Sequence, residues 1–246
     1  MKRRPLFDGS TRTMVKICCI SSIDEAETAI EAGADAIGLV SAMPSGPGII
    51  SDDTIASIMT QVEERVVTVL LTSRSTANAI EAQLKRVRPD ILQIVDSIAT
   101  GELGMVRTRH SGMIVMPVVH VRGAQSLSHA VRLAPSADAL LLDSGNLSAP
   151  VKELGGTGRT HDWQVSRAIC AAVSVPVFLA GGLRPDNVAD AICTVRPSGV
   201  DVCSGVRRHG RLDRVLLATF IAAARQSTNE RVELRLVDAD TIPEVT

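Results

Sequence analysis

The sequence predicts an α/β fold, a single (β/α)8 barrel, and three observations lead to this prediction. Short apolar runs rich in β-branched residues alternate with amphipathic segments between about residue 15 and residue 225, and eight such units can be counted. The apolar runs are almost continuously hydrophobic, which is typical of parallel strands buried on both faces. The length of 246 residues suits a barrel of this kind. An open, doubly wound parallel sheet is the structural alternative.

The eight predicted strands occupy the apolar runs in chain order. We expect them at Val15–Cys19, Ala36–Val40, Val66–Leu71, Ile91–Ile94, Ile114–Val118, Ala139–Asp143, Val175–Ala180 and Val200–Cys203. Amphipathic helices are clearest at Asp24–Ala32, Thr76–Val87 and Pro185–Val195, each beginning near an Asp, Ser or Thr able to cap free N–H groups. The segment TGELGMVRTRHSG has weak periodicity, so the helix after the fourth strand is the least clearly marked.

Three segments are expected along the chain. The barrel should span residues 14–225, preceded by an N-terminal extension at 1–13 and followed by a C-terminal tail at 226–246. Both ends are polar, and neither indicates a function.

The composition favours a globular protein with a small-molecule partner. Hydrophobic residues make up 45% of the chain, charged residues 22% and aromatic residues 2%, and the formal net charge is −1 with scattered basic residues. Such a surface gives no electrostatic reason to expect nucleic acid or an anionic membrane as a partner. The N-terminal residues do not resemble a signal peptide, so we expect a cytoplasmic protein, either a monomer or a homodimer.

The cysteines suggest neither a disulfide framework nor a metal site. Their number is odd and their spacing contains no CxxC pair, so we expect reduced thiols and no metal. The five are Cys18, Cys19, Cys170, Cys193 and Cys203.

Glycine-rich turns follow the sixth, seventh and eighth predicted strands, where barrels of this architecture bind phosphate. Without a Cβ atom, glycine lets backbone N–H groups approach an anion closely, and a short helix starting near Ser204 would add its N-terminal dipole. Tight turns without a ligand are the alternative, but three together favour a phosphorylated small molecule. The residues concerned are Gly155, Gly156, Thr157, Gly158, Gly181, Gly182, Ser204 and Gly205.

Two residues at strand ends are candidates for proton transfer. Asp143 ends the apolar strand ALLLD, where partial desolvation can raise the pKa of a carboxyl toward that of a useful general acid. Cys18 ends the first strand near Lys16, where a poised thiol can act as a base. The alternatives are a loop-stabilising aspartate and a buried cysteine that acts only as a small hydrophobic residue.

The motifs KICCIS, ADAIGLV, LLLDS, GGTGRTHDW, AGGLRPDNV and GVDVCSGV occur in this order, and the chain resembles the phosphoribosylanthranilate isomerase family over residues 14–225. The resemblance implies a TIM barrel that catalyses an Amadori rearrangement of N-(5-phosphoribosyl)anthranilate in tryptophan biosynthesis, without a metal or organic cofactor. It implies that Cys18 is the general base at the ribose C2 carbon and that Asp143 is the general acid on the ring oxygen. It further implies a phosphate site at Gly156, Gly158, Gly182, Ser204 and Gly205, and retention of Gln93 from the family's LQLHG motif.

Several departures from the family's motifs fall on the side of the barrel mouth that would receive the anthranilate. Cys19 replaces the glycine of KICG, and Gly48 aligns with an arginine that pairs with the substrate carboxylate. Val95 and Asp96 replace the histidine and glycine of LQLHG. A charge-assisted contact is therefore missing at residue 48, and losing one typically costs about 1.5–3 kcal/mol.

Other polar residues near the mouth have weaker claims to a function. After the eighth strand, Arg207 and Arg208 replace an acidic residue, in a run, VRRHGRLDR, that we interpret as a solvated loop. The missing positive charge could come from another loop, and the arginines considered for it are Arg74, Arg159, Arg207 and Arg208. His120 and Arg122 are interpreted mainly as loop anchors, and Trp163 as a packing residue beside His161.

Three hypotheses from different classes remain. The first is the phosphoribosylanthranilate isomerase reaction. The second, motivated by Gly48 and Val95, is another isomerase, epimerase or aldol-type enzyme acting on a different phosphorylated sugar or amine. The third is a non-catalytic barrel that binds a phosphorylated ligand, against which the presence of both Cys18 and Asp143 argues.

Overall fold

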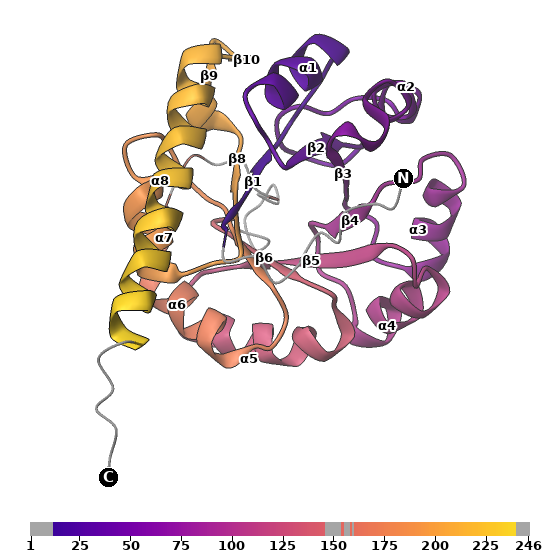
Figure 1. The fold of residues 1–246 in the computed structure, drawn as a ribbon. Coiled ribbons are helices and arrows are strands. Elements are labelled where there is room, and N and C mark those ends of the chain that lie inside the picture. The colour runs from indigo at the N-terminus through magenta and orange to yellow at the C-terminus, as the bar shows by residue number, and fades with distance from the viewer. Residues whose placement is uncertain (1–11, 146–153, 155–157, 159, 240–246) are drawn as a thin grey trace.

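The computed structural model describes residues 12–145, 154, 158 and 160–239, with side chains described up to residue 227. Eight parallel strands form a closed barrel in sequence order, and helices surround it (Figure 1). The predicted fold is therefore confirmed. The strands are β1 (Met14–Ile17), β2 (Ala36–Val40), β3 (Val67–Thr72), β4 (Ile91–Ile94), β5 (Ile114–His120), β6 (Leu140–Asp143), β7 (Val177–Leu179) and β8 (Gly199–Val202).

The helices follow the strands as the sequence predicts, including the weakly marked fourth one. They are α1 (Ile23–Glu31), α2 (Asp52–Val62), α3 (Ala77–Leu84), α4 (Thr100–Arg109), α5 (Gln125–Leu133), α6 (Trp163–Ala172), α7 (Val188–Val195) and α8 (Arg214–Ala239). Side chains cap several of them: Ser22, Ser51 and Thr76 each accept a hydrogen bond from a backbone N–H of the first turn. Short 3-10 turns, η1 (Glu63–Arg65), η2 (Ala134–Ser136) and η3 (Ser204–Val206), and a hairpin of β9 (Arg207–Arg208) and β10 (Arg211–Leu212) complete the described elements.

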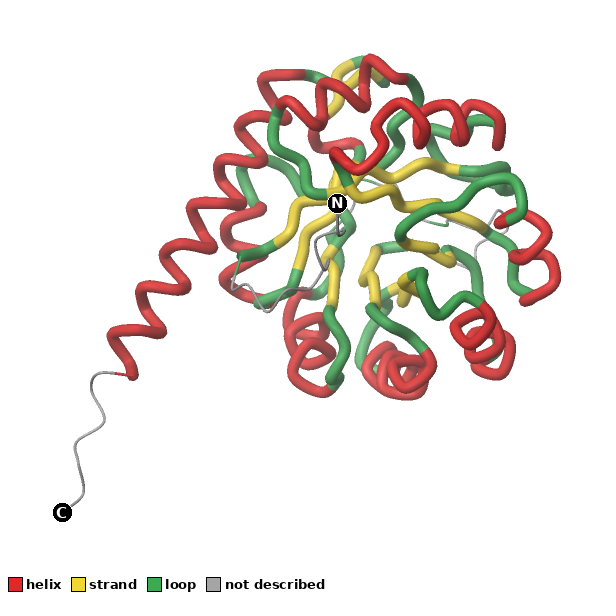
Figure 2. The backbone as a smooth tube through the Cα atoms, turned by 45° about the vertical axis from the view of Figure 1, so that its right-hand side comes forward, coloured by secondary structure: helices red, strands yellow, loops and turns green. Residues whose placement is uncertain are grey.

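Strand and helix ends differ from the expected bounds by a few residues. β1 ends at Ile17, so Cys18 lies directly after the strand, yet its N–H still donates to the carbonyl of Val202 at 2.8 Å. β5 continues to His120, which pairs with Asp143 of β6. The last helix continues past residue 225 to Ala239 and extends beyond the barrel (Figure 2).

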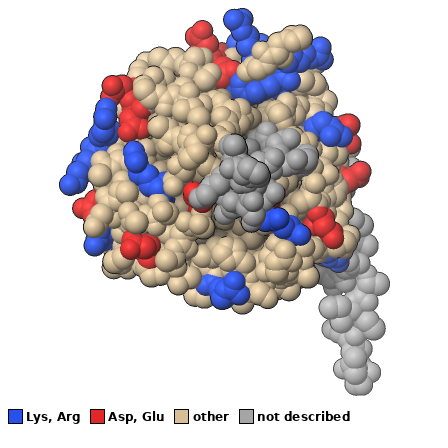
Figure 3. Space-filling model, turned by 180° about the vertical axis from the view of Figure 1, so that it is seen from behind, with Lys and Arg blue, Asp and Glu red and all other residues tan. Residues whose placement is uncertain are grey.

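Alternating side chains build two layers of core. Along β3, Val69 and Leu71 face the barrel interior, while Leu70 packs against the surrounding helices. Burying each such side chain contributes roughly 1.5–3 kcal/mol. On the face drawn in Figure 3, basic and acidic side chains are interspersed. Among the described residues, no helix is both long enough and apolar enough to cross a membrane.

Candidate active site

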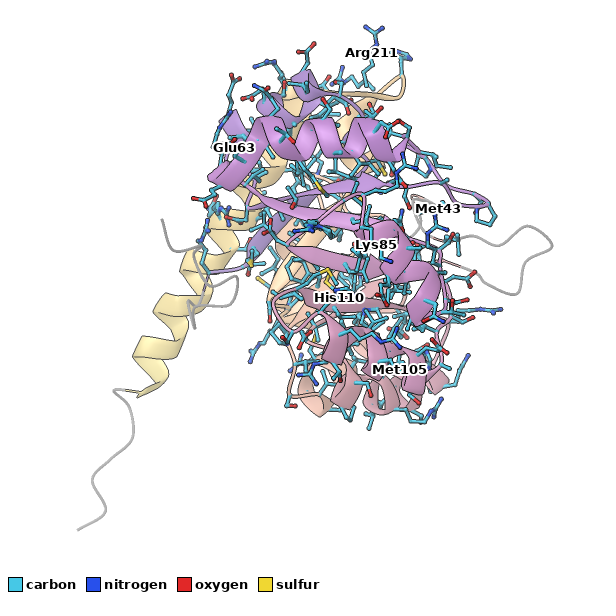
Figure 4. The ribbon with its side chains drawn as sticks, turned by 90° about the vertical axis from the view of Figure 1, so that its right-hand side faces the viewer. Met43, Glu63, Lys85, Met105, His110 and Arg211 are labelled. Carbon is cyan, nitrogen blue, oxygen red and sulfur yellow. The ribbon has the colours of Figure 1, made fainter. Side chains whose placement is uncertain are left out.

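A pocket opens at the carboxyl ends of the strands, the end at which (β/α)8 barrels carry their active sites. Figure 4 shows this end on the right: Met43, in the loop after β2, lies there, whereas Glu63, which follows α2, lies at the opposite end. Of the predicted catalytic and substrate-binding residues that are described, six line this pocket. These are Cys18, Gln93, Asp143, Gly181, Gly182 and Ser204.

An ion pair inside the barrel joins the first and last strands beneath the pocket. Lys16 of β1 is fully buried and donates to Asp201 of β8 at 2.8 Å. Burial alone would lower the pKa of Lys16, but the adjacent Asp201 carboxylate outweighs it, and the pKa is raised. Gly38 of β2 makes room here, because a Cβ atom at residue 38 would lie 3.0 Å from both Lys16 Nζ and Cys18 Sγ. Removing one partner of such a pair typically costs about 3–5 kcal/mol, because the other charge remains buried.

Cys18 lies between this ion pair and the pocket and is only 5% exposed. The neighbouring Cys18 and Cys203 thiols, together with burial, raise the pKa of Cys19. The Cys19 thiol in turn lowers the pKa of Cys203. Three thiols thus share one edge of the pocket.

Asp143 faces the same pocket from the end of β6 and is 8% exposed. Burial raises the pKa of Asp143, against the opposing effect of a hydrogen bond from the Ser144 N–H at 2.7 Å. A carboxyl in this environment keeps its proton to higher pH than an exposed aspartate, which suits a general acid.

His161 lies beside this carboxyl. A Cβ atom at Gly181 would be 3.1 Å from both Asp143 Oδ1 and His161 Nδ1, so both side chains approach the turn after β7. Burial lowers the pKa of His161 to about 4, and its Nε2 hydrogen-bonds to Ser166 Oγ at 2.7 Å. The imidazole is therefore neutral near pH 7.

The turns after β7 and β8 form the predicted phosphate side. Gly181 and Gly182 both have positive φ values, 85° and 65°, and Asn187 supports the turn by donating to the Gly182 carbonyl at 3.0 Å. Gly205 lies so close to the next loop that a Cβ atom there would overlap the carbonyl oxygen of Leu183. The 3-10 turn η3 begins at Ser204, where the sequence predicts a short helix.

The phosphate-side residues that come from the sixth loop are only partly described. Gly158 packs beside Ser204, because a Cβ atom at residue 158 would lie 3.5 Å from Ser204 Oγ. Gly155, Gly156 and Thr157 lie outside the described residues.

Gln93, on β4, is 3% exposed and lines the pocket floor. Its Oε1 has no hydrogen-bond partner among the described residues. A buried amide oxygen without a partner is unfavourable, so a ligand hydroxyl or amine would stabilise it.

The turn after β1 carries a side chain, that of Cys19, at a backbone conformation that favours glycine. Cys19 has φ 62°, a left-handed conformation that costs a side-chain-bearing residue about 1–2 kcal/mol. Its Cβ would lie 2.6 Å from a Cβ atom at Gly48, closer than real Cβ atoms approach. A side chain at residue 48 is therefore incompatible with Cys19 on this backbone, so the residue types allowed at positions 19 and 48 are sterically coupled.

The prediction of a solvated loop after β8 is wrong for Arg207. The Arg207 side chain is 10% exposed and pairs with Glu25 of α1 at 2.7 Å, because the β9–β10 hairpin folds it against the turn after β1. Arg208 does lie at the surface, 65% exposed, and pairs with Asp213. Sequence reasoning missed Glu25, although its position three residues after the helix cap Ser22 is a spacing at which a glutamate bonds backbone N–H groups.

The remaining polar residues near the mouth lie away from the main pocket. His120 bonds the carbonyl of Val95 at 2.9 Å and, with Arg122, lines a separate hollow between the loops after β4 and β5. Trp163 packs against the core at the start of α6, as predicted. In the described part of the chain, no group of three His, Cys, Asp or Glu side chains is arranged to hold a metal ion.

The fold and the site together define a (β/α)8 barrel in which a thiol and a desolvated carboxyl face one pocket beside glycine-rich turns. A family model described as N-(5'phosphoribosyl)anthranilate (PRA) isomerase matches residues 15–223. The chain belongs to the phosphoribosylanthranilate isomerase family.

Named relatives and solved structures agree with this assignment. The N-(5'-phosphoribosyl)anthranilate isomerase of Haloferax volcanii is 38% identical over 215 residues, which cover 87% of this chain and 93% of the relative. The corresponding protein of Methanosarcina acetivorans is 34% identical, over 92% of this chain and 98% of the relative. The crystal structure of the Thermotoga maritima isomerase matches with a TM-score of 0.74 and 27% identity, over 87% of this chain and 99% of that chain. A structure of such an isomerase in complex with reduced 1-(o-carboxyphenylamino)-1-deoxyribulose 5-phosphate matches with a TM-score of 0.73 and 26% identity, over the same shares.

Proposed function

We propose that this protein catalyses the Amadori rearrangement of N-(5-phosphoribosyl)anthranilate, a step of tryptophan biosynthesis. The observation that carries the proposal is the placement of Cys18 and Asp143 in one pocket, in a chain of this family. A reaction of this kind, on a small biosynthetic intermediate, also supports a cytoplasmic location.

The chemistry requires two proton transfers. Asp143 donates a proton to the ring oxygen, the bond from that oxygen to C1 breaks, and the electron pair of the amine forms an imine. Cys18 then takes the proton from C2, which gives an enolamine. The enolamine becomes the ketone of the aminodeoxyribulose phosphate when C1 gains a proton and the C2 hydroxyl releases one, so no proton is gained or lost overall. The raised pKa of Asp143 supports its role as the acid, because the carboxyl must hold a proton when the substrate binds.

The phosphate of the substrate would be held by the turns after β6, β7 and β8. The positive φ values of Gly181 and Gly182 and the short helical turn at Ser204 support this assignment, since backbone N–H groups in such turns bind anions. Gln93 would accept a hydrogen bond from the substrate. The proposed site also includes Gly158 and Gly205, together with Gly155, Gly156 and Thr157 from outside the described residues.

The carboxylate of the anthranilate needs a positive partner that Gly48 does not provide. Arg207 and Arg208 are already paired with Glu25 and Asp213, and Arg159 lies outside the described residues. Among the described candidates, we assign the role to Arg74.

The contacts of Arg74 support this assignment. It follows β3 at the mouth, and its Nε donates to Gln83 at 3.1 Å, which orients the guanidinium, while the described residues leave its terminal nitrogens available. The Gln83 amide in turn donates to Asp52 at 3.3 Å, and Asp52 starts α2 directly after the loop that carries Gly48.

The test is turnover of phosphoribosylanthranilate, generated in place and followed by loss of its fluorescence. We expect Cys18→Ser and Asp143→Asn to lower kcat by about 10²–10⁴-fold. Arg74→Ala should instead raise KM by about tenfold or more.

Two results would contradict the proposal. A wild-type protein that binds inorganic phosphate without turning over the substrate would favour an enzyme for another phosphorylated sugar or amine, which the lack of a charge at Gly48 also motivates. Full activity in both Cys18→Ser and Asp143→Asn would place the chemistry elsewhere.

A further inference from the structure

We propose that Arg207 is a positioning residue: together with Glu25 it holds the turn after β1 in the conformation that presents Cys18 to the substrate. The inference rests on the proposed function, because it assigns a purpose to the geometry of the proposed base.

The guanidinium of Arg207 contacts the backbone of this turn directly. Its Nη2 donates to the carbonyl oxygen of Cys19 at 2.6 Å and lies 3.4 Å from that of Cys18. Its Nη1 donates to the carbonyl of Gly210 at 3.1 Å, within its own hairpin. One side chain therefore links the β9–β10 hairpin to the two residues that follow β1.

Glu25 fixes the guanidinium from the other side. It accepts bonds from Arg207 Nη1 at 2.7 Å and Nη2 at 3.1 Å, and it also accepts the backbone N–H groups of Ser21 at 3.0 Å and Leu212 at 3.1 Å. Burial opposes the charged form of Glu25, but the contact with Arg207 outweighs it and lowers its pKa. The carboxylate thus ties together the end of the turn, the first residues of α1 and the hairpin.

The turn needs such a restraint because of its conformation. Cys19 has a positive φ, and a non-glycine residue persists in this region only where its surroundings determine it. The two carbonyl oxygens that Arg207 contacts flank Cys19, so the contact opposes relaxation of the peptide unit between Cys18 and Cys19. Loss of the contact would let the turn relax and move the Cys18 thiol relative to the substrate.

Arg208 provides a matched control. It precedes the same hairpin turn and carries the same charge, but its side chain is 65% exposed and pairs with Asp213 rather than with the turn. Neutralising Arg207 or Arg208 changes the net charge equally, so a difference between the two variants isolates the contact with the turn.

The experiment measures kcat and KM for Arg207→Gln, Arg207→Lys, Glu25→Gln and Arg208→Gln. We expect Arg207→Gln and Glu25→Gln to lower kcat by about 10–100-fold with KM changed less than about threefold, since small displacements of a reacting group cost rates of this size. Arg207→Lys should recover part of the loss, because an ammonium can still reach a carbonyl and Glu25. Arg208→Gln should stay within about twofold of wild type.

A second readout does not depend on turnover. The rate at which iodoacetamide alkylates Cys18, assigned by fragment mass spectrometry, should change at least about threefold in Arg207→Gln and Glu25→Gln, and not in Arg208→Gln. If the wild type does not turn over the substrate, the proposed function fails while this rate still decides the role of Arg207. Should Arg207→Gln not fold, Glu25→Gln and Arg207→Lys carry the test.

The proposal is overturned if Arg207→Gln and Glu25→Gln have the same kcat and the same Cys18 alkylation rate as Arg208→Gln. It is also overturned if they lose only thermal stability, which would make the ion pair an anchor for the hairpin and nothing more.

Discussion

The two sides of the pocket are built in different ways. On the side formed by β7 and β8, each glycine meets a local requirement, such as the positive φ of Gly181 or the close approach of Gly205 to the Leu183 carbonyl. On the side formed by β1 and β2 the requirement is shared by two residues, because a Cβ atom at Gly48 would overlap the Cβ atom of Cys19. A substitution on the first side can therefore be judged alone, whereas the effect of one at residue 48 depends on residue 19.

Gly205 tests the first side, and its substitution should affect both stability and ligand affinity. In Gly205→Ala, the new Cβ atom would overlap the Leu183 carbonyl, which is backbone and cannot swing away. We expect the free energy of unfolding to fall by about 3 kcal/mol. Affinity for inorganic phosphate should fall at least about tenfold, as measured by calorimetry on the folded fraction.

The matched control is Gly104→Ala in α4. A Cβ atom at Gly104 would meet nothing within 4 Å, so this variant should gain about 0.5–1 kcal/mol from helix propensity. A Gly205→Ala protein that matches wild type in both stability and phosphate affinity would remove the argument for a close-packed phosphate turn.

The coupled side is tested by a double-mutant cycle. Gly48→Ala introduces a Cβ atom 2.6 Å from Cys19 Cβ, at a backbone φ of 73°, and we expect a loss of about 2–4 kcal/mol from strain and overlap together. Cys19→Gly removes the closest contact and leaves the backbone Cα and O atoms of residue 19 at 3.0 and 3.2 Å, so adding Gly48→Ala should cost about 1–3 kcal/mol less than in the wild type. Urea unfolding of the four proteins measures this coupling.

Gly210→Ala serves as the control for backbone strain alone. Gly210 has a similar φ of 78°, and a Cβ atom there would meet nothing within 4 Å. Its cost should be the same with and without Cys19→Gly. Additive costs for Gly48→Ala and Cys19→Gly would mean that the two residues are not energetically coupled.

The smallest effect concerns pH and belongs to the phosphate side. The pKa of His161 is about 4 in the folded protein, against about 6.5 in an unfolded chain, so the unfolded state binds more protons between these values. His161 therefore contributes stability that is complete above pH 6.5 and is lost as pH falls toward 4, with about 1 kcal/mol lost by pH 5.5.

Thermal unfolding at pH 7, 5.5 and 4.5 measures this contribution. His161→Gln, which can keep the bond to Ser166, should flatten the loss, whereas replacing the exposed His209 by Gln should not. If the thermal stability of His161→Gln falls as steeply with decreasing pH as that of the wild type, groups other than His161 cause the effect.

The barrel could be predicted from the sequence because its determinants are local. Each strand is a short apolar run, each is followed by a segment that can form a helix, and the observed bounds differ from the expected ones by a few residues. Asp143 and the glycines of the seventh and eighth turns were identifiable for a related reason: the fold places every strand end at one mouth, so position in the sequence implies position in the site.

The contacts of Arg207 could not be predicted in the same way. Arg207 and Glu25 are 182 residues apart, and their contact depends on how the hairpin after β8 folds over the turn after β1. A run with four arginines and a histidine is typical of a solvated loop, and only the tertiary structure shows which of them is buried. The overlap between Cys19 and Gly48 is similar, since it depends on two backbone conformations that neither motif specifies alone.

The shared space between Cys19 and Gly48 also has a consequence for redesign of the pocket. On this backbone an arginine at residue 48 would place its Cβ atom 2.6 Å from that of Cys19, so it cannot be introduced alone without displacing the turn. A variant that adds a positive charge at this position must therefore begin with Cys19→Gly. The order in which the two substitutions are made then decides whether the intermediate variant carries the overlap.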